Sequence, residues 1–276
     1  MASATQHTGA IAIIDSGLGG ISVVRALLAT DPRMQLIYAA DTAGFPYGGQ
    51  SADAVTARGM GMVEALWQQH RISRVVVACN TLSTLSLAAL RAQFPQITFV
   101  GTVPAVKVAA EQSKTRRFTL LATPNTAHSP YSKSLIDQFA GGCVVDSVGA
   151  PNLASLCEQH LLGRKISDAA WRAEIEPCFH DDARGKTDSI ILGCTHYPLV
   201  TSILKKLSPW DVSWIDSGDA IARQALRNYS GSGIRGAYVT NGDDCAIYSE
   251  LFQREGLGAC QPLPLSVAPV REAANG

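Results

Sequence analysis

Residues 11–29 read IAIIDSGLGGISVVRALLA, and this stretch decides the fold class. Its first four residues are an uninterrupted apolar run, which is typical of a strand covered on both faces of a parallel sheet. A polar, glycine-rich loop follows, and apolar residues then recur at helical spacing. A strand, a short loop and a helix in this order form the first unit of an α/β fold.

The same alternation continues along nearly the whole chain of 276 residues. The predicted strands are 11–15, 36–41, 74–79, 97–101, 118–122, 144–148, 189–194, 212–216 and 237–240. The predicted helices are 21–29, 52–70, 83–94, 104–113, 130–139, 152–162, 169–181, 199–207, 220–228 and 244–255. About nine strands fit two smaller parallel sheets better than one large sheet. The Pro- and Ala-rich tail, residues 257–276, is expected to lie over the surface.

The composition excludes several classes of protein. Lys plus Arg and Asp plus Glu both number 23, so the formal net charge is zero. A duplex-binding protein usually carries a basic excess, so we expect no nucleic-acid partner. The first nine residues lack the features of a signal peptide, and no apolar run approaches the roughly 20 residues that span a bilayer. We therefore expect a cytoplasmic protein with no membrane partner.

The seven cysteines do not form the pattern of a structural framework. Their number is odd and nothing indicates secretion, so a disulfide framework is not expected. No two of them are separated by two residues, which is the spacing typical of structural zinc sites, and no metal is predicted. Most are expected to be small buried hydrophobic residues. Cys79 and Cys194 are the two exceptions.

In an open α/β sheet, ligands bind beyond the carboxyl ends of the strands. The first loop of this kind is DSGLGG, residues 15–20, which partly matches a dinucleotide-binding fingerprint. However, Ser22 stands where the third glycine should be, and Asp15 and Asp41 would both face the phosphate. We therefore favour a tight turn in which the glycines let Asp15 and Ser16 face a cleft.

Cys79 and Cys194 share one local setting in different halves of the chain. Cys79 follows the run VVVA and Cys194 follows SIILG, and small polar residues come after each. Both therefore stand at the carboxyl end of a predicted strand, just before a helix. The dipole and the free N–H groups of a helix N-terminus favour a thiolate over a thiol, so both cysteines are candidate reactive groups.

Two facing thiols suit one kind of chemistry best. A cysteine hydrolase pairs a single thiolate with a histidine and would leave the second cysteine idle. The cysteines of a redox pair usually lie close in sequence. Proton transfer at both faces of one carbon uses two thiols, because one removes the Cα proton while the other supplies a proton from the opposite side. Such a reaction needs a preorganised site for a carbanion-like transition state.

Segments along almost the whole chain resemble the cofactor-independent aspartate/glutamate racemase family, and its glutamate racemases in particular. They are DSGLGG (15–20), DT (41–42) with PYG (46–48), ACNT (78–81), GTVP (101–104), TPNT (123–126) with Ser129 and Tyr131, LGCTHYPL (192–199) and DSG (216–218). The resemblance implies two α/β lobes with mainly parallel sheets, related by a pseudo-twofold axis, with the active site between them. We expect residues 1–98 and 209–276 to form the first lobe and residues 99–208 the second.

The resemblance also implies roles for single residues. Cys79 would act on the D-isomer and Cys194 on the L-isomer, and Asp15 and His196 would assist the two thiols. Glu158 aligns with an auxiliary acidic residue of the family. The substrate would be L- or D-glutamate, and the reaction would need no cofactor. The product D-glutamate would serve peptidoglycan synthesis. The implied substrate-binding residues are Ser16, Pro46, Tyr47, Gly48, Asn80, Thr81, Thr123, Thr126 and Thr195.

Three positions depart from the family pattern. Leu82 begins a Leu-Ser-Thr run where Ala-Ser-Ala is usual, and we expect it to narrow or reshape the pocket beside the first thiol. Gly49 with Gln50 removes a positive charge, and Ala150 replaces a cysteine. These departures leave open a related two-cysteine racemase that acts on aspartate or another amino acid. A binding protein without activity is the alternative from another class, against which both retained thiols argue. A homodimer is left open.

Overall fold

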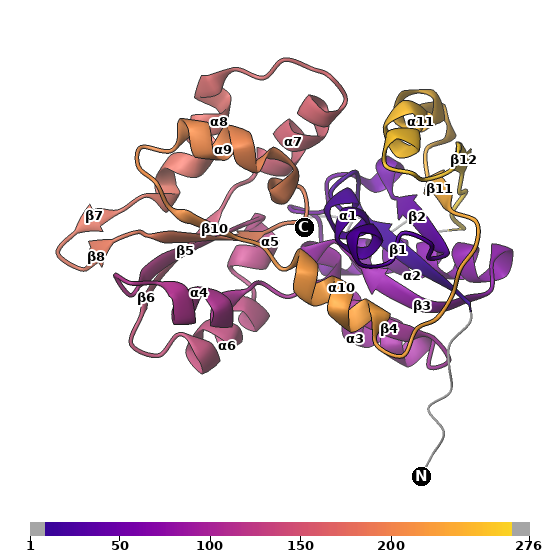
Figure 1. Ribbon diagram of the computed structural model, residues 1–276, viewed down its shortest axis with the longest axis horizontal. Helices are drawn as coiled ribbons and strands as arrows, with labels where there is room; N and C mark the ends of the chain where they lie inside the picture. The colour runs from indigo at the N-terminus through magenta and orange to yellow at the C-terminus, as the bar shows by residue number, and fades with distance from the viewer. Residues whose placement is uncertain (1–8, 267–276) are drawn as a thin grey trace, which may run out of the picture.

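The computed structural model describes residues 9–266, which form two lobes (Figure 1). The strands of the first lobe are β1 (Ala10–Asp15), β2 (Leu36–Ala40), β3 (Ile72–Val77), β4 (Thr98–Gly101), β11 (Gly236–Val239) and β12 (Cys260–Pro262). The strands of the second lobe are β5 (Arg117–Ala122), β6 (Val144–Gly149), β7 (Asp181–Asp182), β8 (Gly185–Lys186), β9 (Ser189–Gly193) and β10 (Ser213–Ile215).

Helices cover both faces of each sheet. They are α1 (Ile21–Thr30), α2 (Ala52–Gln69), α3 (Asn80–Gln93), α4 (Val106–Gln112), α5 (Pro124–Ala127), α6 (Pro130–Phe139), α7 (Leu153–Leu161), α8 (Asp168–Ile175), α9 (Thr201–Leu207), α10 (Gly218–Leu226) and α11 (Cys245–Arg254). Short 3-10 turns lie at η1 (Thr42–Gly44), η2 (Glu176–Cys178), η3 (Tyr197–Val200) and η4 (Gly242–Asp244).

The two large sheets are parallel throughout. The six-stranded sheet has the order β12-β11-β2-β1-β3-β4, and the four-stranded sheet has the order β10-β9-β5-β6. Of the named strands within residues 9–266, only β7 and β8 pair antiparallel, as a small hairpin. The predicted α/β class with mainly parallel sheets is confirmed.

The central strand β1 shows why its sequence is an unbroken apolar run. Successive side chains of a strand point to opposite faces of the sheet. Ile11 and Ile13 pack with residues of α1, α10 and α11, whereas Ala12 and Ile14 pack with residues of α2 and α3. Both faces are therefore buried, and only the carboxyl end of the strand is left to approach a ligand.

The chain crosses between the two sheets a few residues beyond the expected limits. Strand β4 belongs to the six-stranded sheet and β10 to the four-stranded sheet. The crossings therefore come after Gly101 and after Ile215. We propose to divide the lobes there, instead of after residues 98 and 208.

The C-terminal tail contains one strand that the sequence does not predict. Residues 260–262 form β12, which pairs in parallel with β11 at the edge of the six-stranded sheet. The run Cys-Gln-Pro has neither the length nor the apolar alternation that predicts a strand. The last ten residues of the expected tail, 267–276, lie outside the described residues.

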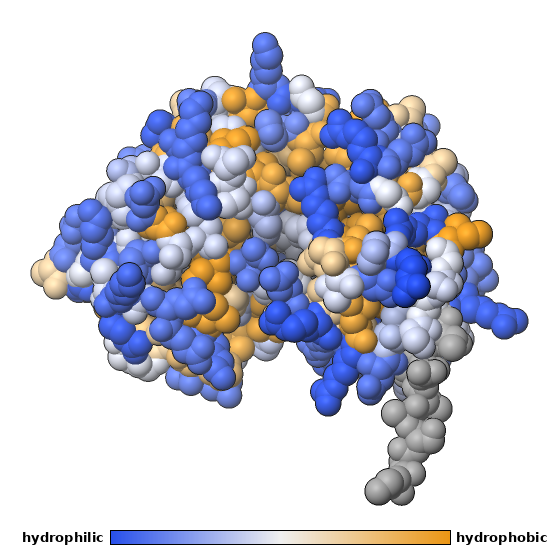
Figure 2. Space-filling view, in the orientation of Figure 1, coloured by the Kyte–Doolittle hydropathy of each residue, from blue (hydrophilic) through white to orange (hydrophobic). Residues whose placement is uncertain are grey.

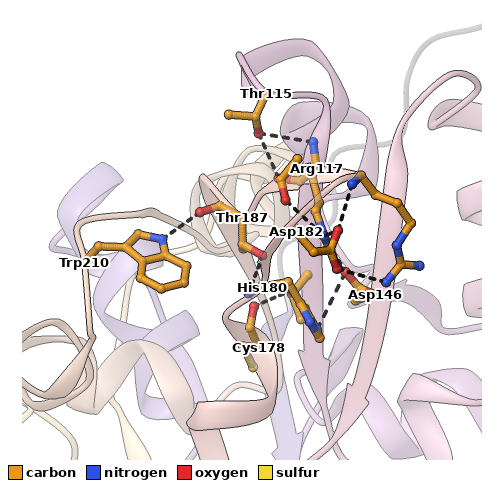
Figure 3. Close-up of polar contacts among 11 residues, drawn as sticks. Thr115, Arg117, Asp146, Cys178, His180, Asp182, Thr187 and Trp210 are labelled. Carbon is orange, nitrogen blue, oxygen red and sulfur yellow. Dashed lines mark hydrogen bonds and ion pairs between the residues drawn. The ribbon is translucent and has the colours of Figure 1, made fainter.

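Arg117 anchors the β7-β8 hairpin to the amino end of the four-stranded sheet (Figure 3). Its side chain is fully buried, and its Nε donates to Asp146 of β6 at 3.0 Å. Its Nη1 donates to Asp182 of β7 at 2.7 Å and to the carbonyl of Gly185 at 3.0 Å. This cluster lies at the start of β5, so it supports the lobe from the end opposite to the strand ends that can meet a ligand.

No helix within residues 9–266 is both long and apolar enough to cross a membrane. Figure 2 shows a mainly hydrophilic face on which hydrophobic residues gather in separate patches.

Candidate active site

One small cavity between the lobes brings the two candidate cysteines together. Cys79 follows β3 in the first lobe, Cys194 follows β9 in the second, and both line this cavity with 6% of their surface exposed. Its volume is about 30 Å³. The lining residues are Ser16, Phe45, Pro46, Tyr47, Gly48, Gly49, Cys79, Asn80, Thr81, Thr123, Pro151, Ala154, Cys194, Thr195 and His196.

Cys79 caps the N-terminus of α3. The backbone N–H of Leu82 donates to its Sγ at 3.5 Å, and the thiol donates to the Ser16 hydroxyl at 3.8 Å. Burial nevertheless raises the pKa of Cys79 to about 12, and the charge of Asp15 adds to this effect. Burial therefore favours the thiol form of Cys79, because loss of solvent opposes the effect of the helix N-terminus.

Cys194 is paired with a histidine from the same loop. Its Sγ lies 3.8 Å from Nδ1 of His196, whose Nε2 lies 2.7 Å from Oε2 of Glu158. Burial lowers the pKa of His196, but the hydrogen bonds and charges of Cys194 and Glu158 outweigh burial and hold that pKa well above its usual value. The sulfur, imidazole and carboxylate thus form a linked series.

Glu158 is buried and accepts hydrogen bonds from both lobes. The backbone N–H of Leu18 donates to its Oε2 at 2.8 Å, and the hydroxyl of Tyr248 donates to its Oε1 at 2.7 Å. With His196, these donors supply what a buried carboxylate needs in place of water. Tyr248 comes from α11, and the sequence analysis missed it because no local motif marks it.

The glycine-rich loop after β1 allows the second lobe to approach closely. A Cβ on Gly17 would lie 2.8 Å from Oε2 of Glu158, and one on Gly19 would lie 2.7 Å from the hydroxyl of Thr195. The Gly19 N–H also points at Nε2 of His196 at 3.1 Å. These glycines therefore allow the two lobes to lie in close contact. The loop forms the tight turn that the sequence favours over a phosphate-binding loop.

Asp15 lies beneath the cavity and does not line it. Its carboxylate accepts from the Gly17 N–H at 2.9 Å and from the Thr195 hydroxyl, across the lobe boundary, at 3.0 Å. Burial raises the pKa of Asp15, and His196 and these two donors offset part of the rise. Asp15 is therefore placed to influence Cys79 through its charge.

The cavity gathers all the predicted substrate-binding residues except Thr126. The hydroxyl of Thr126 accepts a hydrogen bond from Thr123 at 3.1 Å, so it lies one residue behind the lining. Thr123 in turn lies 3.0 Å from the hydroxyl of Thr81 in the other lobe. This threonine series crosses the lobe boundary beside Cys79.

The hydroxyl of Tyr47 is already engaged. It donates to Asp41, which also accepts from the guanidinium of Arg58 and, at 2.5 Å, from the hydroxyl of Thr240. The residue therefore lines the cavity while its hydroxyl fixes the loop that carries Gly48. The sequence analysis did not find Arg58 or Thr240, because both act through Asp41.

The departures from the family pattern lie mostly away from the cavity. Leu82 is fully buried in the apolar core, and a Cβ on Gly59 of α2 would meet it at 2.6 Å. The expectation that Leu82 narrows the pocket is wrong, because its side chain points into the gap that Gly59 leaves. The Gln50 amide donates to the carbonyl of Gly44 at 2.6 Å and to that of Pro46 at 2.9 Å, so it braces the same loop.

Within residues 9–266, no group of three or more His, Cys, Asp and Glu side chains is arranged to hold a metal ion. The chemical groups at the cavity include two thiols, an imidazole backed by a carboxylate, the amide of Asn80 and several hydroxyls.

Comparisons with known proteins agree with one another. Residues 21–225 match the family model described as Asp/Glu/hydantoin racemase. A glutamate racemase of Agrobacterium fabrum is 45% identical over 215 residues, which cover 78% of this chain and 79% of that protein. A glutamate racemase of Sinorhizobium fredii is 42% identical over 244 residues, covering 87% and 89%. The crystal structure of Escherichia coli glutamate racemase in complex with L-glutamate and activator UDP-MurNAc-ala is similar at a TM-score of 0.86, with 31% identity and coverage of 94% and 99%.

Proposed function

The chain belongs to the Asp/Glu/hydantoin racemase family, and from this premise we propose that it interconverts L- and D-glutamate by proton transfer between two thiols. The product D-glutamate would supply peptidoglycan synthesis. The observation that carries the proposal is that Cys79 and Cys194, from different sheets, line the same cavity.

In the direction from L- to D-glutamate, Cys194 acts as the base and Cys79 as the acid. The Cys194 thiolate removes the Cα proton and becomes a thiol, while the Cys79 thiol gives its proton to the opposite face and becomes a thiolate. His196, whose Nδ1 lies 3.8 Å from the sulfur of Cys194, is the side chain placed to assist this cysteine. The reverse reaction begins from the mirror protonation state.

The environment of Cys79 suits its role as the acid in the direction from L- to D-glutamate. Burial and the charge of Asp15 raise the pKa of Cys79 to about 12, which favours the thiol form. A thiol at Cys79 is the acid needed to form D-glutamate. The ammonium group of a bound substrate offsets the negative charge of Asp15 and makes the later thiolate at Cys79 easier to form.

The first test is racemisation itself. Purified protein with no cofactor added should abolish the circular dichroism signal of L-glutamate, because inversion at Cα produces a racemic mixture. L-aspartate in a parallel reaction tests the alternative substrate. Loss of signal from aspartate alone would contradict glutamate as the substrate, and no loss from either would contradict the racemase proposal.

The second test separates the two thiols. A 3-chloro analogue of glutamate can lose its Cα proton to one thiolate and expel chloride without any proton from the other side. We expect Cys79→Ser and Cys194→Ser to suppress racemisation strongly in both directions. Cys194→Ser should still release chloride from the D-configured analogue, and Cys79→Ser from the L-configured one. Equal release from both isomers by one variant would show a single base and overturn the two-thiol mechanism.

Two further properties belong to this proposal. We propose that the reaction takes place in the cytoplasm, where catalytic thiols stay reduced.

We also propose that the protein forms a homodimer, which analytical ultracentrifugation of the purified chain would test.

A further inference from the structure

A second pair of cysteines lies outside the lining of the cavity, at the edge of the first lobe. Sγ of Cys245, the first residue of α11, lies 3.0 Å from Sγ of Cys260, the first residue of β12. Both are partly exposed, whereas the two cavity cysteines and Cys157 and Cys178 are buried. The mechanism uses neither residue of this pair.

The backbone on both sides of the pair is fixed. Cys260 pairs with Ala237 of β11, and its N–H donates to the Ser249 hydroxyl of α11 at 3.3 Å. The two thiols are therefore held together by the helix and the sheet edge, and only a small movement separates them from bonding distance, since a disulfide is about 2.05 Å long.

We propose that Cys245 and Cys260 form a reversible intrachain disulfide when the chain meets a small-molecule disulfide such as oxidised glutathione. The Cys245 thiolate, at the N-terminus of a ten-residue helix, attacks one sulfur of the oxidant and releases one thiolate. The Cys260 thiol then loses its proton, attacks the Cys245 sulfur of the mixed disulfide and releases the second. The protein loses two hydrogens, and the oxidant is reduced to two thiols.

The bond would join α11 covalently to the edge of the sheet. Tyr248, one turn after Cys245 on α11, donates to Glu158 behind the active site. The bond therefore fixes the helix that carries this contact. It also closes a short loop in the unfolded chain, which lowers the entropy of that state and stabilises the fold. The proposal does not depend on the substrate.

The test exposes the full chain to oxidised glutathione under native conditions and follows thiols, mass and thermal stability. We expect a loss of two free thiols, a mass lower by two hydrogens, and one non-reduced peptide that joins Cys245 to Cys260. The thermal midpoint should rise by about 5 °C and fall back on addition of a reductant.

Matched variants make the result specific. Cys245→Ser and Cys260→Ser should each abolish the linked peptide and the rise in midpoint. Cys143→Ser, at another partly exposed cysteine, should leave both unchanged. The proposal is overturned if peptide mapping finds Cys245 and Cys260 still reduced, or stably bound to one glutathione each, under conditions that oxidise a free dithiol.

Discussion

The protonation of Cys79 governs how this residue reacts with thiol reagents. A thiolate is the nucleophile, and burial with the Asp15 charge raises the pKa of this thiol to about 12. In the empty protein, we expect alkylation of Cys79 by iodoacetamide to be slow near pH 8. Its rate should rise about tenfold per pH unit beyond pH 9, where an ordinary thiol levels off. Mass spectrometry of the Cys79 peptide measures the rate, and a plateau by pH 9 would contradict the buried thiol.

Tyr248 is a positioning residue for one thiol only. It donates to Glu158, which holds His196 against Cys194, and none of these residues contacts Cys79. We expect Tyr248→Phe to keep the ring packing but to weaken racemisation by about tenfold in both directions, because Cys194 is the base in one direction and the acid in the other, and one hydrogen bond to a charged group contributes about 1.5 kcal/mol or more.

The chloro analogue provides a readout that a general loss of stability would not produce. Combined with Cys79→Ser, the Tyr248→Phe change should lower chloride release from the L-configured analogue. Combined with Cys194→Ser, it should leave release from the D-configured analogue unchanged. An equal decrease in both would show that Tyr248 acts only on overall stability.

At the scale of residues, the sequence reveals the groups with a repeated local setting. Cys79 and Cys194 stand out because both follow an apolar strand and precede small polar residues. Tyr248 carries no such mark, because its partner Glu158 is 90 positions away in the chain. The direction of the Leu82 side chain cannot be predicted from its neighbours in sequence, because it depends on the space beside Gly59 on a neighbouring helix.

The glycines of the loop between β1 and α1 allow the second lobe to approach this loop closely. A methyl group on Gly19 would collide with His196 and Thr195 of the other lobe. We expect Gly19→Ala to reduce racemisation by about a hundredfold, because displacing a catalytic group by about 1 Å has an effect of that size. The far-UV circular dichroism should stay native. Gly141→Ala is the control, since nothing lies within 4 Å of a Cβ there, and activity equal to wild type in Gly19→Ala would refute the role of this close approach.

The β7-β8 hairpin should respond to acid. Hydrogen bonds from the Arg184 N–H and from Arg117 lower the pKa of Asp182 to about 2, below its unfolded value of 3.8. A lowered folded pKa contributes stability that is present above the unfolded pKa and is lost as the pH falls. We expect the urea midpoint to fall between about pH 4 and pH 2, and Asp182→Asn to reduce that part of the pH dependence. If the urea midpoint of Asp182→Asn falls with pH as steeply as that of the wild type, the pairing of Asp182 with Arg117 is contradicted.

At the scale of elements, apolar runs predicted the strands that are buried on both faces. Strand β12 was missed because an edge strand of three residues is held by backbone pairing and needs no apolar pattern. Helix α3 begins at Asn80, three residues before its predicted start, because Cys79 caps it with its sulfur. A cysteine is not among the usual capping residues, so the sequence gives no start signal there.

The molecule as a whole presents a problem of access. The cavity of about 30 Å³ has room for about two water molecules, and glutamate has about ten non-hydrogen atoms. The lobes are also joined across the site, because Thr195 donates to Asp15 and the Leu18 N–H donates to Glu158. We therefore expect substrate to enter when the lobes separate and these bonds break. Because both lobes contribute a thiol, the same separation also takes the catalytic pair apart.

Hydrogen exchange should detect this separation. The amide of Leu18 is protected by Glu158 of the opposite lobe, whereas the amides of Ala12 to Ile14 are protected inside the first sheet. Without glutamate, we expect the Leu18 amide to exchange much faster than those of β1, because opening of the lobes costs less than opening of the sheet. Saturating glutamate should slow it by at least about tenfold and leave β1 unchanged, because a ligand held between the lobes favours the closed state. Exchange at Leu18 that is as slow as in β1, with or without glutamate, would show that the lobes stay together and that substrate must reach the thiols by another route.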